Sequence, residues 1–335
     1  MHEQIKRAQI DGTPLIVGES ATLVWRGRTA PMLIGDFNDW DARRATALTE
    51  AAPRVWTRTL DLPRDAYIEY AFVKGDKRVP DPFNARLTPN GFGDANHFFY
   101  MPDATPTPLA RHVVENEWLV VGGRRAVYLY QPPVDEPCPL LVVLDGQDYL
   151  RRAKLPTLVD NLIAQKRIRP IALAMPANHR QARVIEYGCS DSTLAFLLYV
   201  VLPLAREHLN LIDIEAYPGA HGVLGASMGG LAALYFGLRA PHVFGKVLSQ
   251  SGAFNAIGHD FVVFDLIRDG PARPIRTWMD AGKFEWLLEC NRRMRDLMTS
   301  KGYLVEYREY SGGHNYPAWR DHVWRGLEHL FATTN

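Results

Sequence analysis

Short runs of alternating hydrophobic and polar residues dominate the first hundred positions of the chain. Between residues 21 and 100 these runs are rich in Val, Ile, Thr, Tyr, Phe and Trp, and Gly, Pro, Asn and Asp separate them. The clearest runs are ATLVWRG, PMLIGDF, RVWTRTLDL and YIEYAFVKG. Because the runs recur about every ten residues and no helical period of useful length interrupts them, they predict a small antiparallel β-sandwich.

The pattern changes after residue 110, where apolar strand-like runs alternate with helical stretches. The strand-like runs are RRAVYLYQP, PLLVVLDGQ, IRPIALAMPA, HGVLGASMGG, GKVLSQSGAF, IRTWMDAGK and LVEYREYSGG. Such alternation is typical of a mostly parallel sheet covered by helices on both faces, the α/β class. The Pro-rich segment MPDATPTPL at 101–109 resembles a linker. We therefore predict a β-sandwich domain over 1–105 and an α/β domain over 106–335.

Composition narrows the possible partners of the chain. The 38 Lys and Arg residues nearly balance 37 Asp and Glu residues, and a net charge of +1 gives no reason to expect nucleic acid or a membrane surface. The longest apolar stretch, 194–205, is too short to span a bilayer and contains Pro203. The first residues lack the apolar core of a signal peptide, so we expect a cytoplasmic protein. The sequence leaves the oligomeric state open.

The three cysteines are odd in number and widely spaced, which argues against a disulfide framework. Cys138, Cys189 and Cys290 also form no C-x-x-C pair, and no pair of histidines has zinc-binding spacing. We predict that the protein uses neither a metal ion nor an organic cofactor.

A G-x-S-x-G pattern at 225–229 carries the most specific chemistry in the chain. The apolar strand end Val223-Leu224 precedes it, and the helix-forming run LAALYFGL follows. A serine at a sharp strand-to-helix turn is exposed as a nucleophile, and small neighbouring residues permit the tight backbone approach. Ser227 is therefore the predicted nucleophile, and the turn directs the Met228 N–H toward the position of a developing oxyanion.

A serine hydroxyl needs a general base, and the α/β-hydrolase chain order is serine, acid, histidine. His314 follows the last strand-like run in the Gly-rich segment SGGH, which we expect to be a flexible turn, and it is the predicted base. His322 and His329 lie in the amphipathic C-terminal stretch, where a surface or packing role is expected. His259 comes too early, in the loop after the run GKVLSQSGAF.

The acid should follow the penultimate strand-like run, IRTWM, and two residues compete for the role. Asp280 stands at the strand end, the commonest place for this residue. Glu285 opens the next helical stretch, where the helix dipole would keep it ionised. Position alone leaves both open.

The second oxyanion donor should come from the loop that ends the strand-like run PLLVVLDGQ. Asp145-Gly146-Gln147 occupies that place. Gly146 is expected to let the backbone turn so that the Gln147 N–H points inward.

The chained motifs LLVVLDGQDYL, GVLGASMGG, DAGKFEWLLECNRRMRDL and SGGHNYPAWRD resemble the esterase D family, and within it the enterochelin esterases. The similarity runs from about residue 115 to 330 and implies an α/β-hydrolase fold. The family's Gly-x-x-Glu motif matches 282–285, so the resemblance assigns the triad acid to Glu285. It also assigns the nucleophile to Ser227, the histidine to His314, and the oxyanion N–H groups to Met228 and Gln147.

Two other segments bear on the substrate. The family's Arg-x-x-Glu-Leu-x-Cys-Asn motif is present as RVIEYGCS at 183–190, with departures at Tyr187 and Ser190 that put the inherited substrate in doubt. In the β region, GDFNDWD at 35–41 and YIEYAFVKG resemble the immunoglobulin-like N-terminal domains of glycogen-branching enzymes. There Trp40 either anchors the sandwich or stacks on a sugar.

The leading functional hypothesis is a serine carboxylic-ester hydrolase that cleaves a small-molecule ester or lactone, such as a ferric siderophore, through an acyl-serine. Alternatives are a feruloyl or acetyl esterase for plant polysaccharide, an acyltransferase of the same fold, and a glycan-binding module with a degenerate hydrolase. A bulky, anionic aromatic substrate needs cationic and aromatic side chains. Candidates on loops near the site are Arg180, Arg183, Lys283, Trp319 and Arg320.

Overall fold

The computed structural model describes residues 3–75, 77–90, 93–106, 116–120, 125–179, 182–256 and 258–333, with the backbone alone for 116–120. Internal contacts divide the chain into two compact units. The β unit comprises Met1–Pro106, Gly282–Trp286 and Tyr310–Ala318, and the α/β unit comprises the other residues. The boundary that the sequence predicts between residues 105 and 106 remains a prediction.

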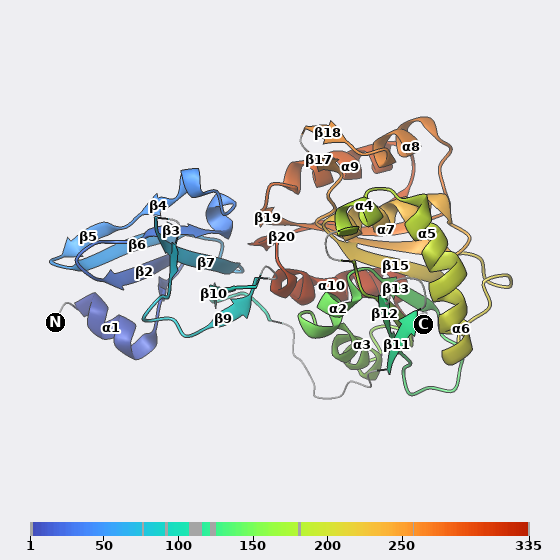
Figure 1. Cartoon of the computed structure of the whole chain (residues 1–335), viewed down its shortest axis with the longest axis horizontal. Helices are drawn as coiled ribbons and strands as arrows, with labels where there is room; N and C mark the ends of the chain where they lie inside the picture. The colour runs from blue at the N-terminus through green and yellow to red at the C-terminus, as the bar shows by residue number, and fades with distance from the viewer. Residues whose placement is uncertain are drawn as a thin grey trace. The chain divides into compact units, whose positions relative to one another are not determined.

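Two antiparallel sheets build the β unit (Figure 1). One has the strand order β1-β2-β6-β5, and the other has the order β4-β3-β7-β10-β9 with β8 paired to β7. The strands are β1 (Leu15–Val17), β2 (Ser20–Arg26), β3 (Met32–Gly35), β4 (Thr46–Ala47), β5 (Thr49–Ala52), β6 (Val55–Asp61), β7 (Tyr67–Lys74), β8 (Lys77–Val79), β9 (Leu87–Pro89) and β10 (Ala95–Tyr100). Short 3₁₀ turns at Asp36–Asn38 (η1) and Ala42–Arg44 (η2) follow β3.

One apolar core lies between the two sheets of this unit. Leu23 of β2, Leu33 of β3 and Phe72 of β7 are fully buried in the same cluster, so the inner faces of both sheets contribute to it. Helix α1 (Glu3–Asp11) packs through Ile5 and Ala8 against Val24 and Val55. The predicted antiparallel sandwich is present, and its immunoglobulin-like class remains a prediction.

The α/β unit is built on an eight-stranded sheet of order β11-β12-β14-β13-β15-β16-β19-β20. The central strands β14, β13, β15, β16 and β19 pair in parallel, and β11 and β12 are antiparallel. The strands are β11 (Asn116–Val120), β12 (Arg125–Tyr130), β13 (Leu140–Val143), β14 (Ala172–Pro176), β15 (His221–Ala226), β16 (Phe244–Gln250), β19 (Arg276–Phe284) and β20 (Leu304–Gly313), with the small hairpin β17 (Asn255–Ala256) and β18 (His259–Asp260) outside the sheet. The mostly parallel sheet that the alternation of strand-like and helical runs predicted is confirmed.

Helices cover both faces of this sheet (Figure 1). Because neighbouring strand residues point to opposite faces, Val142 packs with the cluster of α5 to α9, while Leu141 faces the other side. On that other side a Cβ on Gly222 would meet both Leu141 and Phe331 of α10. The helices are α2 (Gly146–Arg151), α3 (Leu155–Ala164), α4 (Arg183–Tyr187), α5 (Asp191–Phe196), α6 (Leu202–His208), α7 (Met228–Arg239), α8 (Val263–Asp269), α9 (Leu288–Ser300) and α10 (Tyr316–Phe331).

Two helix boundaries differ from the sequence pattern. The apolar stretch at 192–208 is not one α-helix, because a π-helical segment (Leu197–Val201) joins α5 to α6 just before Pro203, which has no N–H to donate. Helix α10 begins at Tyr316, six residues earlier than the apolar pattern indicates. Trp319 and Arg320 therefore lie in a helix and not in the predicted loop.

Candidate active site

Ser227 occupies a strained corner between β15 and α7. Its φ and ψ are 59° and −123°, a region that L-residues other than glycine rarely adopt. Its N–H donates to the Gln250 carbonyl at 2.9 Å, and its carbonyl accepts the N–H of Ala253 at 3.0 Å, so the corner is held from both sides. A Cβ on Gly225 would lie 2.3 Å from the Gly229 carbonyl oxygen, which explains the small residues around the turn. This geometry is that of a nucleophile elbow.

The loop after β13, which was expected to carry the second oxyanion donor, turns differently from the expectation. Asp145, and not Gly146, takes the left-handed conformation, with φ at 56°. Gly146 is needed for close approach, since a Cβ there would lie 2.2 Å from the Met175 carbonyl oxygen. Gln147 is the second residue of α2, and its side-chain oxygen accepts the N–H of Asn178 at 3.0 Å.

The buried Asp145 joins this loop to β15 through hydrogen bonds, a role that the sequence analysis did not assign to it. The carboxylate is fully buried and receives two charged hydrogen bonds from Arg183, at 2.7 and 2.6 Å. The same guanidinium donates to the carbonyl of Ala226, the residue before Ser227, at 3.3 Å. The Asp145 N–H donates to the Tyr187 hydroxyl at 2.9 Å. Arg183, expected to bind substrate, thus lies in α4 and joins the loop after β13 to the last residue of β15.

Tyr187, which departs from the resembled motif, has a defined place in this network. Its side chain is 3% exposed, and burial first, then the charge of Asp145, raises the pKa of its phenol. A protonated hydroxyl remains available to accept from the Asp145 backbone. The tyrosine at this position therefore supports the loop after β13 through its hydroxyl.

In the β unit, His314 and Glu285 form a direct pair. Nδ1 of His314 lies 3.0 Å from Oε2 of Glu285, whose side chain is completely buried. The exposed Trp286 ring packs on the imidazole, with centroids 4.6 Å apart, which restricts its rotation. The second carboxylate oxygen, Oε1, is buried and has no hydrogen-bond partner among the described residues. Glu285 lies in the turn before α9 and not within the helix as expected, since α9 begins at Leu288.

The Gly-Gly pair before His314 is not the flexible turn that the sequence suggested. Gly312 and Gly313 are the last two residues of strand β20. Trp286 was also not identified from the sequence, because a single Trp after a candidate acid carries no pattern.

Asp280, the competing acid, was expected at the strand end but lies within β19, which continues to Phe284, and it is 1% exposed. Its carboxylate accepts the Trp278 indole N–H at 2.9 Å and faces the Gln250 amide nitrogen at 3.4 Å. Its backbone carbonyl accepts the Ser251 N–H at 2.7 Å. These contacts connect the end of β16 to the middle of β19.

The other predicted substrate residues have different environments. Trp319 is 4% exposed and its indole N–H donates to Ser251 at 2.9 Å, so its ring belongs to the core of the α/β unit and offers no face to a substrate. Arg320 pairs with Asp321, and Lys283 is exposed on β19. Arg180 lies outside the described residues. Trp40 donates its indole N–H to Asp36 at 3.0 Å, and the Arg78 guanidinium lies 5.2 Å from its ring centre.

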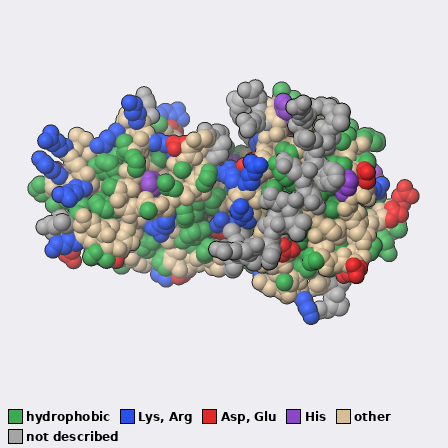
Figure 2. Space-filling view, turned by 60° about the horizontal axis from the view of Figure 1, so that its bottom comes forward, with side chains coloured by type: hydrophobic (Ala, Val, Ile, Leu, Met, Phe, Trp, Pro, Cys, Tyr) green, Lys and Arg blue, Asp and Glu red, His purple; other side chains and the backbone are tan. Residues whose placement is uncertain are grey.

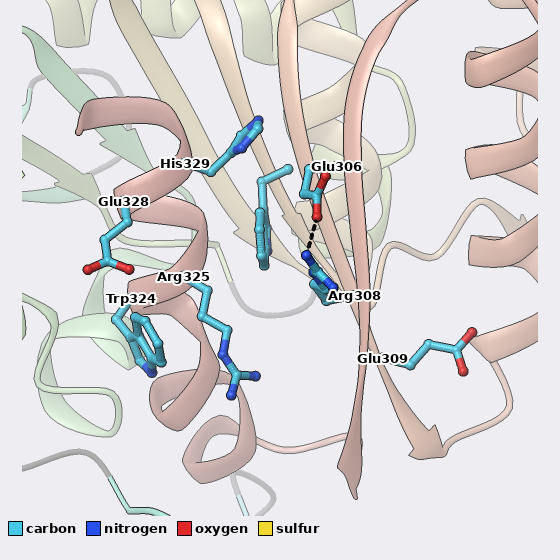
Figure 3. Close-up of a pocket in the computed structure, with 8 residues that line it drawn as sticks. Glu306, Arg308, Glu309, Trp324, Arg325, Glu328 and His329 are labelled. Carbon is cyan, nitrogen blue, oxygen red and sulfur yellow. Dashed lines mark ion pairs between the residues drawn. The ribbon is translucent and has the colours of Figure 1, made fainter. Parts of the chain in front are cut away.

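A separate hollow of about 690 Å³ lies between β20 and α10 (Figure 3). Glu306 and Arg308 form an ion pair on β20 with a separation of 2.7 Å, and side chains of α10 line the other side. None of the candidate site residues lines this hollow. We therefore assign no part of the reaction to it.

Figure 2 shows, on one face of the molecule, Lys and Arg side chains in several places among hydrophobic and polar ones. In the described part of the chain, no group of three His, Cys, Asp or Glu side chains has metal-binding geometry. None of the described helices is long and apolar enough to cross a membrane.

Comparison with known proteins gives a consistent assignment. The iron(III) enterobactin esterase of Dickeya dadantii is 32% identical over 232 residues, which cover 63% of this chain and 53% of that protein. The chain thus spans about half the length of this relative. The iron(III) enterobactin esterase of Escherichia coli K12 is 25% identical over 272 residues, covering 76% of this chain and 67% of that protein.

The fold is shared with a solved enterobactin esterase. The structure of the Shigella flexneri enzyme, determined in the presence of enterobactin, matches with a TM-score of 0.78 at 21% identity, covering 93% of this chain and 92% of that one. At this identity the match shows the α/β-hydrolase-like fold alone. The Esterase family model matches residues 120–330, which is more than half of the chain. The chain therefore belongs to the esterase family.

Proposed function

We propose that this protein is a serine carboxylic-ester hydrolase of the enterochelin esterase type. Ser227 is the nucleophile, His314 the general base and Glu285 the acid that orients it, while the N–H groups of Met228 and Gln147 form the oxyanion hole. The observation that carries the proposal is the strained backbone of Ser227 at the end of β15. Strain of this kind persists where function requires it, because a serine in an ordinary turn has no need of it.

The His314–Glu285 pair supports the assignment of the base. A carboxylate facing Nδ1 holds the proton on that nitrogen, which leaves Nε2 as the lone-pair acceptor. Nε2 takes the Ser227 proton as Oγ attacks the ester carbonyl, and the imidazolium is stabilised by Glu285. It then gives the proton to the leaving alcohol, and water repeats the sequence on the acyl-serine. Chain order agrees, because Ser227, Glu285 and His314 each follow a strand of one sheet.

We propose a ferric siderophore with ester or lactone bonds as the substrate class. The relatives named above are iron(III) enterobactin esterases, and the Shigella flexneri structure was determined with enterobactin. Both units are shared with that structure, since the match covers 93% of the chain. The exposed Trp286, beside the proposed base, offers an aromatic face for a catecholate ring.

The test measures hydrolysis of a p-nitrophenyl ester, a catecholate trilactone with and without ferric iron, and feruloyl and acetyl sugar esters. Ser227→Ala should lower kcat on every substrate by about 10⁴–10⁶-fold and abolish labelling by a fluorophosphonate, with an unchanged circular dichroism spectrum. Retention of a tenth of the turnover would refute the nucleophile. Preference for the sugar esters would refute the siderophore substrate and leave the esterase mechanism in place.

A further inference from the structure

A buried carboxylate of the β unit lies directly against the segment that carries His314. Asp36 opens η1, after β3, and is 2% exposed. Its Oδ2 accepts the Glu69 backbone N–H at 2.8 Å and the Asn315 side-chain N–H at 3.4 Å, while Oδ1 accepts the Trp40 indole N–H at 3.0 Å. Asp36 and Asn315 are 279 positions apart in the sequence.

The same carboxyl group also touches the backbone on the other side of the histidine. A Cβ built on Gly313 would lie 2.2 Å from both Cγ and Oδ1 of Asp36. Real Cβ atoms do not approach this closely, so the carboxyl group occupies the space that a side chain at Gly313 would take. Asp36 therefore contacts the residue before His314 and the residue after it.

Asp36 is itself rigidly held, so it can serve as a reference point. Its partner Glu69, on β7, is 2% exposed and accepts hydrogen bonds from the Tyr67 hydroxyl at 3.0 Å and from Asn96 of β10 at 2.7 Å. A chain of hydrogen bonds thus runs from two neighbouring strands of the β unit to Asp36 and on to Asn315. A carboxyl group suits this place because each of its two oxygens accepts a hydrogen bond from a neighbouring N–H group.

We propose that Asp36 is a positioning residue that fixes the loop of the general base, so that the N-terminal β region forms part of the catalytic apparatus. This inference rests on the proposed function of His314. The inference gives the GDFNDWD segment a role other than sugar binding, because the indole N–H of Trp40 donates to Asp36. The negative charges that face Asp36 are Glu69 and Glu285. Burial, followed by these two charges, raises the pKa of Asp36.

The test compares Asp36→Ala and the milder Asp36→Asn with a matched control, Asp81→Asn. Asp81 lies in the same unit, is 5% exposed and also accepts three hydrogen bonds, from Thr13, Tyr70 and Phe83, and none of these residues belongs to the His314 segment. Asp36→Ala should lower kcat by about 10²-fold with little change in KM, because a shift of about 1 Å in the base has this effect. Asp81→Asn should lower the melting temperature with an unchanged kcat.

A spectroscopic readout separates this inference from the proposed function. The His314 Nδ1–H, bonded to Glu285, should give a low-field proton resonance that disappears in His314→Ala. The resonance should persist in Asp81→Asn and be lost or broadened in both Asp36 variants, whether or not the protein hydrolyses esters. A retained resonance together with an unchanged kcat in Asp36→Asn would overturn the inference. If Ser227→Ala loses its activity while the Asp36 variants keep theirs, the proposed function stands and only the inference about Asp36 fails.

A double-mutant cycle tests the contact itself. Asn315→Asp keeps the oxygen that accepts the Ala318 N–H at 2.9 Å but turns a second carboxylate toward Asp36. Its effect on kcat should vanish in the Asp36→Ala background. Fully additive effects would show that the two residues act separately and would contradict the positioning role.

Discussion

Replacing Glu285 by Gln changes one atom of the His314–Glu285 pair and leaves the volume of the side chain nearly unchanged. The amide has two orientations in this pocket, and the surroundings of the carboxylate penalise both. With the amide nitrogen at the position of Oε2, 3.0 Å from Nδ1, a donor faces the imidazole. The histidine must then carry its proton on Nε2, where it cannot accept the proton of Ser227.

The opposite orientation keeps the correct tautomer and places the NH₂ group at the position of Oε1. That atom is buried and has no hydrogen-bond partner among the described residues. A buried donor without a partner costs about 1–3 kcal/mol, and the neutral amide no longer stabilises the imidazolium. Because either orientation is unfavourable, we expect kcat to fall by about 10²–10⁴-fold.

The assay is steady-state hydrolysis of a p-nitrophenyl ester, with a thermal melt of each variant to separate catalysis from stability. Asp280→Asn is the matched control, since Asp280 is equally buried and accepts the Trp278 N–H at 2.9 Å. It should lower the melting temperature and reduce kcat by less than about 10-fold, the effect of a structural residue. The reverse ranking of the two variants would transfer the acid role to Asp280 and refute the argument from the Nδ1 contact.

Three further predictions follow from the structure. Arg183→Ala should reduce the free energy of unfolding by about 3–5 kcal/mol, measured by urea denaturation, because it leaves the buried Asp145 carboxylate without its cationic partner, with the Asn178 amide still donating to it; a loss below 1 kcal/mol would contradict a structural role for this ion pair. His221 accepts the Leu140 N–H, and burial, followed by the charges of Arg206 and Lys246, lowers its pKa to about 4. The folded state favours the neutral imidazole of His221. The contribution of this residue to the free energy of unfolding, about 3 kcal/mol in all, is therefore complete above pH 6.5 and is lost as the pH falls toward 4. Melting temperatures of His221→Asn should therefore depend less steeply on pH over this window than those of the wild type, and parallel curves would refute the assignment. Excess EDTA should leave ester hydrolysis unchanged, because a triad needs no metal; a loss of activity that zinc restores would show otherwise.

The sequence pattern determined the elements whose cause is local. The strand-like runs before and after residue 110 form strands in the structure. The spacing of apolar positions within each run favours a strand, whichever neighbouring segments pack against it. The elbow at Ser227 was also predictable, since the turn depends on small residues within two positions of the serine and on the strand and helix beside it. The start of α10 at Tyr316 could not be predicted. The residues around Trp319 and Arg320 have no periodic apolar pattern that would distinguish the first turn of a helix from a loop.

Only the tertiary structure decided which side chains meet. Asp280 and Glu285 were equivalent by position along the chain, and the 3.0 Å contact of Glu285 with His314 distinguishes them. The sequence placed Asp145 in the loop expected to carry an oxyanion donor, but its ion pair with Arg183, 38 positions away, depends on the tertiary structure. Asp36 could not be connected with Asn315 at all, across 279 positions. Backbone propensity acts over a few residues, whereas buried charges and hydrogen bonds depend on which distant segments the packed core brings together, and no local pattern records that choice.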